Sequence, residues 1–209
     1  TSTYVGDDIE LAIAACTPGD TLILPGGTFT LTGTLGNLVI DKEVVIIGAG
    51  YLSATAPVTQ PTVIVNAPGT PRDVVLSNNS DGTSIHGIRF DLNGGSVKFT
   101  NSGTLNVSFF RCDLSAVELG TTGGGAVNSQ IHFQECLIGS LNGWSATSVT
   151  IDNCILRSAL QGFFTAGLTM RNCVVHSWNN MSGGAGNFYY KSILMRNGNP
   201  TGLAETNAC

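Results

Sequence analysis

The sequence predicts an all-β solenoid, in which one chain of short strands winds into stacked coils and a helix covers the N-terminal end. Three observations predict it. A strand pattern recurs about every 20 residues, one stretch alone has a helical pattern, and segments rich in Gly, Ser and Thr join the copies. Each coil of such a repeat buries its apolar side chains against its neighbours, which accounts for a short period without helices.

The helical stretch covers residues 8–16. It starts with Asp, and Pro-Gly follows its end, as is typical of helix boundaries. We expect its apolar face to cover the first coil, so that residues 1–20 form an N-terminal cap region. Residues 21–29 then have the pattern of strand, turn and strand. Short apolar runs continue the series at residues 38–40, 44–47, 63–65 and 74–76.

The later copies share the pattern apolar-x-apolar-x-x-anchor-x-apolar. Alternation places their apolar residues on one face, with a two-residue corner between two strands. Asn153 and Asn172 lie at such corners, and Asn tolerates the left-handed backbone that a corner needs. We expect coils over residues 21–196 and a tail over residues 197–209. The anchors, spaced by 18 to 24 residues, are Ile88, Cys112, Cys136, Cys154, Cys173 and Ile193.

Two other folds fit this pattern less well. Leucine-rich repeats share the period, but the Leu and Asn spacing that they need is absent. A β-sandwich would not put one residue type at the same phase of every repeat.

The opening of the chain resembles the pectin-lyase-like family of right-handed parallel β-helices. The resemblance lies in the helix, in Pro-Gly-Asp-Thr-Leu-Ile-Leu-Pro-Gly-Gly-Thr-Phe at residues 18–29, and in Val-Val-Ile-Ile-Gly-Ala-Gly at residues 44–50. The coil pattern extends it to about residue 196. The resemblance implies a single-stranded right-handed parallel β-helix, and we expect a single domain over residues 1–209. Because the family includes lyases, hydrolases, adhesins and phage fibres, it implies no single activity.

The cysteines are expected to be structural. No C-x-x-C occurs and no His lies at metal spacing from a Cys, so we expect no metal and no cofactor. Neighbouring coils lie about 4.8 Å apart, so the four anchor cysteines should form a ladder inside the solenoid. This spacing exceeds the Cβ separation of about 3.8 Å that disulfides prefer, which favours free buried thiols. Redox or metal chemistry is the alternative.

The composition limits the partners and the location. Hydrophobic residues make up 42% of the chain and charged residues 11%, and the net charge is −5. Clustered cations for phosphate binding are lacking, so nucleic acid is a poor partner. No apolar run approaches the roughly 20 residues of a membrane-spanning helix. Solubility must come from hydroxyl and amide groups, and this composition indicates a secreted or cell-surface protein.

Four residues are candidates for chemistry on the outer face. Asp152, Arg171 and Lys191 are expected at one outward phase of successive coils, with His132 beside them. A polysaccharide lyase needs a base for the proton alpha to a carboxylate and a cation, calcium included, to neutralise that carboxylate. The alternative is a solvated row with weak ion pairs. The motifs of family enzymes are missing: clustered aspartates, Gly-His-Gly and Arg-x-Pro-x-x-Arg.

A second outward row is apolar where solvent is expected. Its members are Leu137, Ile155, Val174 and Leu194. Such a row contacts another protein or is covered by a segment of the same chain.

The last coil has no helix to cover it, and an uncovered coil exposes strand edges. Three explanations remain open: the tail covers this coil, the sequence is part of a longer one, or another subunit stacks there. Head-to-tail stacking generates filaments. A disulfide between Cys16 of one subunit and Cys209 of the next is a hypothesis within the third explanation.

These observations favour a secreted, non-catalytic β-helix with a structural, fibre-forming or adhesive role, assembling with itself or with another surface protein. The first alternative is a polysaccharide lyase or glycoside hydrolase. The second is a module that binds an acidic polysaccharide, with Trp144, Trp178 or Tyr189 as stacking platforms.

Overall fold

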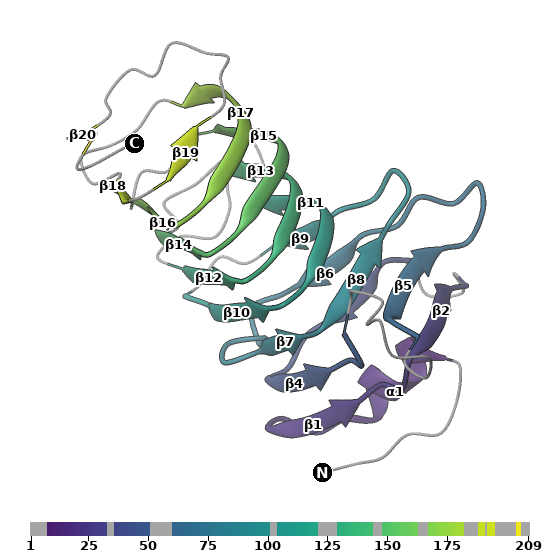
Figure 1. Ribbon diagram of the computed structural model, residues 1–209. Coiled ribbons are helices and arrows are strands. Elements are labelled where there is room, and N and C mark those ends of the chain that lie inside the picture. Colours follow the sequence, from purple (N-terminus) through teal and green to yellow (C-terminus); the bar gives the residue numbers. More distant parts are fainter. Residues whose placement is uncertain are drawn as a thin grey trace.

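The computed structural model describes residues 8–32, 36–50, 60–100, 104–120, 129–143, 148–162, 167–181, 188–190, 192–194 and 204–205. Within them the chain forms one helix and otherwise strands, and every pairing between strands is parallel (Figure 1). The prediction of an all-β chain with parallel sheets is therefore confirmed.

The predicted N-terminal helix is confirmed as α1 (Ile9–Ala15). The Asp8 carboxylate caps it by accepting hydrogen bonds from the backbone N–H groups of residues 10 and 11, at 3.0 and 3.1 Å. At the other end, Lys42 Nζ donates to the carbonyl oxygens of residues 14 and 16, both at 3.1 Å, where the helix dipole favours a cation. The buried face of α1, with Ile9 and Ile13, belongs to the main hydrophobic core.

The strands form two sheets. Sheet A contains, in spatial order, β1 (Asp20–Ile23), β4 (Val44–Ile47), β7 (Ser84–His86), β10 (Asn106–Phe110), β12 (Gln130–Gln134), β14 (Ser148–Asp152), β16 (Leu168–Arg171), β18 (Phe188–Tyr190) and β20 (Ala204–Glu205). Sheet B contains β2 (Gly27–Leu31), β5 (Thr62–Asn66), β8 (Ile88–Asp91), β11 (Asp113–Leu119), β13 (Leu137–Gly143), β15 (Ile155–Gly162), β17 (Val174–Met181) and β19 (Ile193–Leu194), with β3 (Leu38–Ile40), β6 (Val74–Leu76) and β9 (Val97–Phe99).

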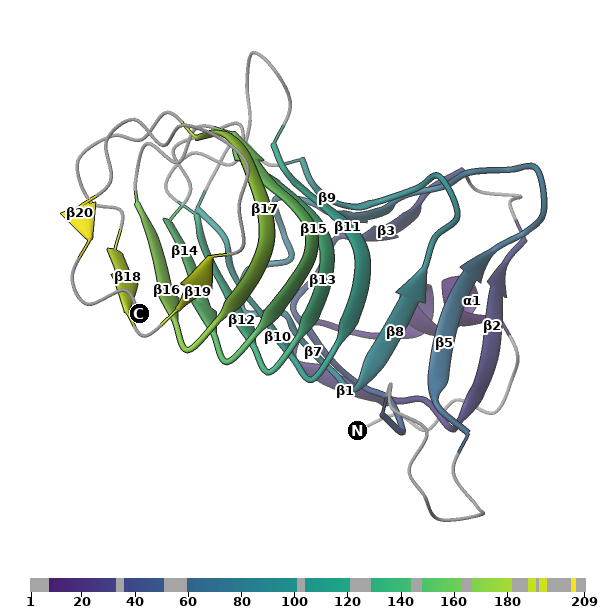
Figure 2. The ribbon, with the colours of Figure 1, turned by 45° about the horizontal axis from the view of Figure 1, so that its top comes forward.

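From β10 to β17 the chain alternates between the sheets, and each strand pairs with the strand two elements later. One strand of sheet A together with the following strand of sheet B is called a coil below. Figure 2 shows β11, β13, β15 and β17 as long curved strands that lie side by side. The shorter β8 and β9 both pair with β11, one with each end of it. The core fills the space between the two sheets with alternate side chains of both, including Phe109 and Phe133, whose rings stack with centroids 5.2 Å apart.

Corners between the sheets have the left-handed backbone that the sequence predicts at Asn153 and Asn172, with φ of 54° and 52°. Glu135 and Arg111 occupy the same corner one and two coils before Asn153, with φ of 54° and 51°. The N–H groups of Arg111, Glu135 and Asn153 each donate to a carbonyl of the following coil, for example from Asn153 to Arg171 at 2.9 Å. The hydrogen-bonded ladder therefore continues through the corner.

The predicted cysteine ladder is confirmed. Cys112, Cys136, Cys154 and Cys173 are free and buried. The backbone N–H of Cys112 donates to Cys136 Sγ at 3.4 Å, and that of Cys136 donates to Cys154 Sγ at 3.3 Å. At the last described coil the sequence interpretation is wrong by one residue. Val174 pairs with Ile193, so Ser192, not Ile193, takes the anchor position, and its hydroxyl accepts from the Cys173 N–H at 3.3 Å.

Burial predicts that the four anchor thiols are unreactive in the native protein. Burial raises the pKa of Cys173 to about 11, and the hydrogen bond with Cys136 together with burial raises the pKa of Cys154. Because the thiolate is the reactive form, a thiol reagent at neutral pH should modify these residues only after denaturation. Peptide mapping by mass spectrometry before and after adding guanidinium checks this. Rapid native labelling of Cys136 or Cys154 would contradict the ladder.

Replacing Asn172 tests the corner. Alanine and glycine variants both lose the hydrogen bond from Asn172 Nδ2 to Asn153 Oδ1, 3.2 Å long, so their comparison isolates the backbone conformation. Asn172→Ala should have a free energy of unfolding about 1 kcal/mol below that of Asn172→Gly, because a Cβ is strained at positive φ. Urea unfolding of the two variants measures the difference. An alanine variant as stable as the glycine variant would contradict a left-handed corner.

Candidate functional site

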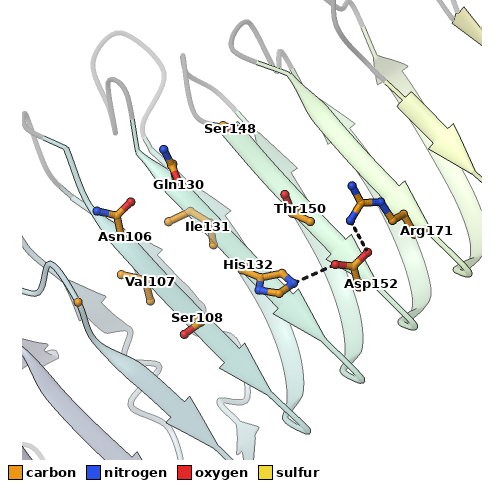
Figure 3. Close-up of a pocket in the computed structure, with 11 residues that line it drawn as sticks. Asn106, Val107, Ser108, Gln130, Ile131, His132, Ser148, Thr150, Asp152 and Arg171 are labelled. Atoms are coloured by element: carbon orange, nitrogen blue, oxygen red, sulfur yellow. Dashed lines mark hydrogen bonds and ion pairs between the residues drawn. The ribbon is translucent and has the colours of Figure 1, made fainter.

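The outer face of sheet A carries an open groove with a volume of about 480 Å³. Parallel register places outward residues of successive strands in rows: Ser108 pairs with His132 and His132 with Thr150, while Asp152 pairs with Arg171. The groove crosses β10, β12, β14 and β16 (Figure 3). Its lining consists of Gly82, Asn106, Val107, Ser108, Gln130, Ile131, His132, Ser148, Thr150, Asp152 and Arg171.

Three charged or titratable side chains meet in this groove. His132 Nε2 lies 3.0 Å from Asp152 Oδ2, and an Arg171 guanidinium nitrogen lies 3.7 Å from Asp152 Oδ1 (Figure 3). These three residues come from three neighbouring strands, β12, β14 and β16. The prediction that His132, Asp152 and Arg171 share one outer face is confirmed.

The most exposed charged group of this cluster is the Arg171 guanidinium. The Asp152 side chain is 19% exposed, whereas that of Arg171 is 56% exposed and that of His132 is 41% exposed. Asp152 lies between the two, so its negative charge is partly covered and partly neutralised. The exposed guanidinium is accessible to a ligand in the groove, and a carboxylate or sulfate can pair with it.

The register corrects one candidate. Arg171 pairs with Tyr190, so the row through Asp152 and Arg171 continues at Tyr190 and not at Lys191. The sequence interpretation was one residue out because it took Ile193 in place of Ser192 as the anchor. Lys191 itself lies outside the described residues, as does Trp144.

The groove also contains polar residues that the sequence pattern does not predict as site residues. Asn106, Gln130 and Ser148 begin β10, β12 and β14 and form a third outward row beside that of Ser108 and His132. All three stand six positions before an anchor cysteine, so the repeat could have predicted that they form a row. No catalytic or binding motif distinguishes them in the sequence. Amide and hydroxyl groups in rows provide hydrogen bonds for a polar ligand.

A second polar cluster adjoins the groove at β7. Ser84 Oγ and His86 Nε2 lie 2.6 Å apart, and the Ser108 hydroxyl donates to Ser84 Oγ at 3.2 Å. The His86 ring packs against Phe110 with centroids 5.7 Å apart. Burial lowers the pKa of His86, which favours the neutral ring that can accept a hydrogen bond from Ser84.

The predicted apolar row on sheet B is confirmed in three of its four members. Leu137 pairs with Ile155 and Ile155 with Val174, and Ile155 remains 45% exposed. The prediction that Leu194 belongs to this row is wrong, because Leu194 pairs with Val175 while Ile193 pairs with Val174. The cause is the same as for Lys191: Ser192 occupies the anchor position that the sequence pattern assigns to Ile193.

The two terminal cysteines differ in what the structure shows. Cys16 is buried and free, and its thiol donates to the Ala12 carbonyl oxygen at 3.3 Å. This thiol would have to leave its site to reach another subunit. Cys209 lies outside the described residues, so the proposed link between the two stays a prediction.

Comparison of the chain with models of protein families, with curated proteins and with solved structures finds no match in any of the three. Among the described residues, no group of three or more His, Cys, Asp or Glu side chains is placed to hold a metal ion. No helix in the described part of the chain has the length and apolar character needed to cross a membrane.

Burial of His86 predicts a pH-dependent stability. Because its pKa is lowered in the folded state, the neutral ring stabilises the fold fully above about pH 6.5, and this contribution is lost as the pH falls below that value. The wild type should therefore lose more unfolding free energy than His86→Gln between about pH 8 and pH 5. Urea unfolding across that range measures the slopes, with the exposed His176→Gln as the control for losing one histidine. Equal slopes for the wild type and His86→Gln would contradict the burial effect.

Proposed function

We propose that the chain is a single-domain right-handed parallel β-helix of the pectin-lyase-like type. Three features support this. The strands alternate between two parallel sheets, each coil pairs in register with the next, and the anchor cysteines stack inside. An N-terminal helix packed on β2 and β3 is also consistent with a cap on the solenoid.

We further propose that the protein is extracellular and adhesive, and that it binds an acidic polysaccharide along sheet A in a non-catalytic groove. The observation that carries this proposal is the exposed Arg171 beside a covered Asp152, in an open groove of amides and hydroxyls. The chain as a whole has a net charge of −5, and the exposed Arg171 guanidinium provides a local point of attraction for an anionic polymer.

The direction of the groove supports a polymeric ligand. It runs across four strands, so that equivalent polar groups recur along it at the strand spacing of about 4.8 Å. A repeating chain of sugars can use such recurring hydrogen-bonding groups at several positions. Many weak contacts along one ligand then add to a useful affinity.

The titratable groups favour binding over hydrolysis. Glycoside hydrolysis uses two carboxyl groups on opposite sides of the bond that is cleaved. Among the described residues that line the groove, Asp152 is the one acidic residue, and it is already engaged by His132 and Arg171. Secretion is consistent with the burial of the five described thiols, which protects them in an oxidising compartment.

A polysaccharide lyase is the second candidate, because the structure brings His132, Asp152 and Arg171 into contact. In that mechanism Arg171 would neutralise the substrate carboxylate, which acidifies the neighbouring carbon-bound proton. His132, oriented by Asp152, would remove this proton as a general base. The leaving group would then be eliminated to give an unsaturated sugar.

Arg171→Ala tests the proposal. The variant should bind polygalacturonate or alginate about 10-fold more weakly than the wild type, since one charge-assisted hydrogen bond contributes roughly 1.5 kcal/mol. Affinity should fall with added salt, and neutral dextran should not bind. Calorimetry or a gel-retardation assay measures these effects. Arg89→Ala is the matched control, because Arg89 is 47% exposed on sheet B and should leave binding unchanged.

The same polymers separate the two candidates. Ultraviolet absorbance of an unsaturated product, abolished by His132→Asn, would replace the non-catalytic proposal with the lyase. Equal affinity of the wild type for acidic and neutral polymers, or no binding to any of them, would contradict a cationic binding groove.

A further inference from the structure

The serine and histidine of β7 have the geometry of an activated nucleophile. Ser84 Oγ and His86 Nε2 are 2.6 Å apart, within the range expected for a nucleophile and its base. Both side chains are on the outer face of sheet A and are partly exposed, so a small substrate can reach them. This pair lies outside the residues that line the groove.

The surroundings of His86 fix its position. Its ring packs against Phe110 with centroids 5.7 Å apart, and its strand position pairs with Ile47 on β4 and with Phe110 on β10. These neighbours are apolar, and burial lowers the pKa of His86, which favours its neutral ring. A neutral imidazole can accept the proton of a serine hydroxyl.

Ser108 completes the arrangement. Its hydroxyl donates to Ser84 Oγ at 3.2 Å and also lines the neighbouring groove. Ser84 therefore accepts one hydrogen bond from Ser108 and can donate another to His86. When an acyl group is bound to Ser84, the same Ser108 hydroxyl is close enough to turn its proton toward the developing oxyanion.

We propose that Ser84 and His86 form an esterase site for small acyl esters, such as acetyl esters, with Ser84 as the nucleophile. Ser84 Oγ attacks the ester carbonyl carbon while its proton passes to His86 Nε2. The bond between the acyl carbon and the alkoxy oxygen then breaks, and the leaving alcohol takes the proton from His86. Water next attacks acyl-Ser84, gives one proton to His86 and releases the carboxylic acid, and that proton returns to Ser84 Oγ.

The site goes beyond the proposed binding function and does not depend on it. Polysaccharide binding rests on Arg171 in the groove, whereas the esterase rests on two residues of β7. Each can fail without the other.

A fluorophosphonate probe tests the proposal on the whole protein. Its phosphorus forms a bond to Ser84 Oγ and loses fluoride, with His86 taking the proton, so that one stable adduct per chain is expected. Mass spectrometry of the digested protein should place the adduct on Ser84. Ser84→Ala should remove the label, and His86→Asn should slow labelling about 100-fold, the usual loss for a missing general base.

Two further variants keep the test decisive. Thr169→Ala removes an outward hydroxyl from the same row of sheet A, away from His86, and should label at the wild-type rate. His86→Gln replaces His86→Asn if the latter does not fold, as judged by circular dichroism. No adduct, an adduct on another serine, or equal labelling rates with and without His86 would overturn the proposal. Release of phenolate from an aryl acetate, with a transient acetyl group on Ser84, would confirm turnover.

Discussion

The interaction on which the rest of the structure depends is the parallel hydrogen bonding of each coil to the next, unbroken through the corner between the sheets. At the corners, N–H groups such as those of Arg111 and Glu135 donate to carbonyls of the following coil at 3.0 and 2.9 Å. The first residue of the next strand donates in the opposite direction, to a carbonyl of the preceding coil, for example from the Leu137 N–H to the Cys112 oxygen at 2.9 Å. Because both strands and corner are fixed relative to the next coil, equivalent side chains must form rows.

These rows explain the core and the surface together. Inside, a row of thiols and a stack of phenylalanines occupy constant positions although the anchors are 18 to 24 residues apart. The length differences must therefore be absorbed in the segments between coils. Outside, the same register places His132, Asp152 and Arg171 on adjacent strands, about 4.8 Å apart at the backbone, where their side chains can meet. The register between strands therefore explains why these three side chains meet in the groove.

The repeating pattern of the sequence predicts most features that depend on the register between coils. The N-terminal helix, the cysteine ladder, the Asn corners and three of the four candidate site residues could all be predicted, because an alternating pattern with a repeated residue type fixes register. At β18 and β19 the predicted register is wrong by one residue. A buried Ser192 takes the anchor position there in place of a cysteine, and two apolar residues follow it. A buried hydroxyl is compatible with the core there because it accepts the Cys173 N–H, which the pattern of residue types does not reveal.

Contacts that depend on side-chain conformation could not be predicted. The Ser84–His86 hydrogen bond joins residues two apart on one strand, and alternation says only that both point outward. The left-handed Arg111 and Glu135 are residue types that do not usually adopt this backbone. Arg111 and Glu135 form an ion pair of 2.7 Å between neighbouring coils, and the Arg111 guanidinium lies 5.0 Å from the centre of the Phe110 ring. The local sequence therefore predicts the left-handed corners at Asn153 and Asn172 but not those at Arg111 and Glu135.

The most direct test of coil stacking is a pair of distances along one outward row of sheet A. Thr21, Ser108 and Thr169 share this row, on β1, β10 and β16. Spin labels at introduced cysteines should give backbone separations of about 14 Å for Thr21 and Ser108 and about 29 Å for Thr21 and Thr169. The buried native thiols should not take the label. Distances that do not double between the two pairs, or that are broadly scattered, would contradict a chain in which each coil hydrogen-bonds in register to the next.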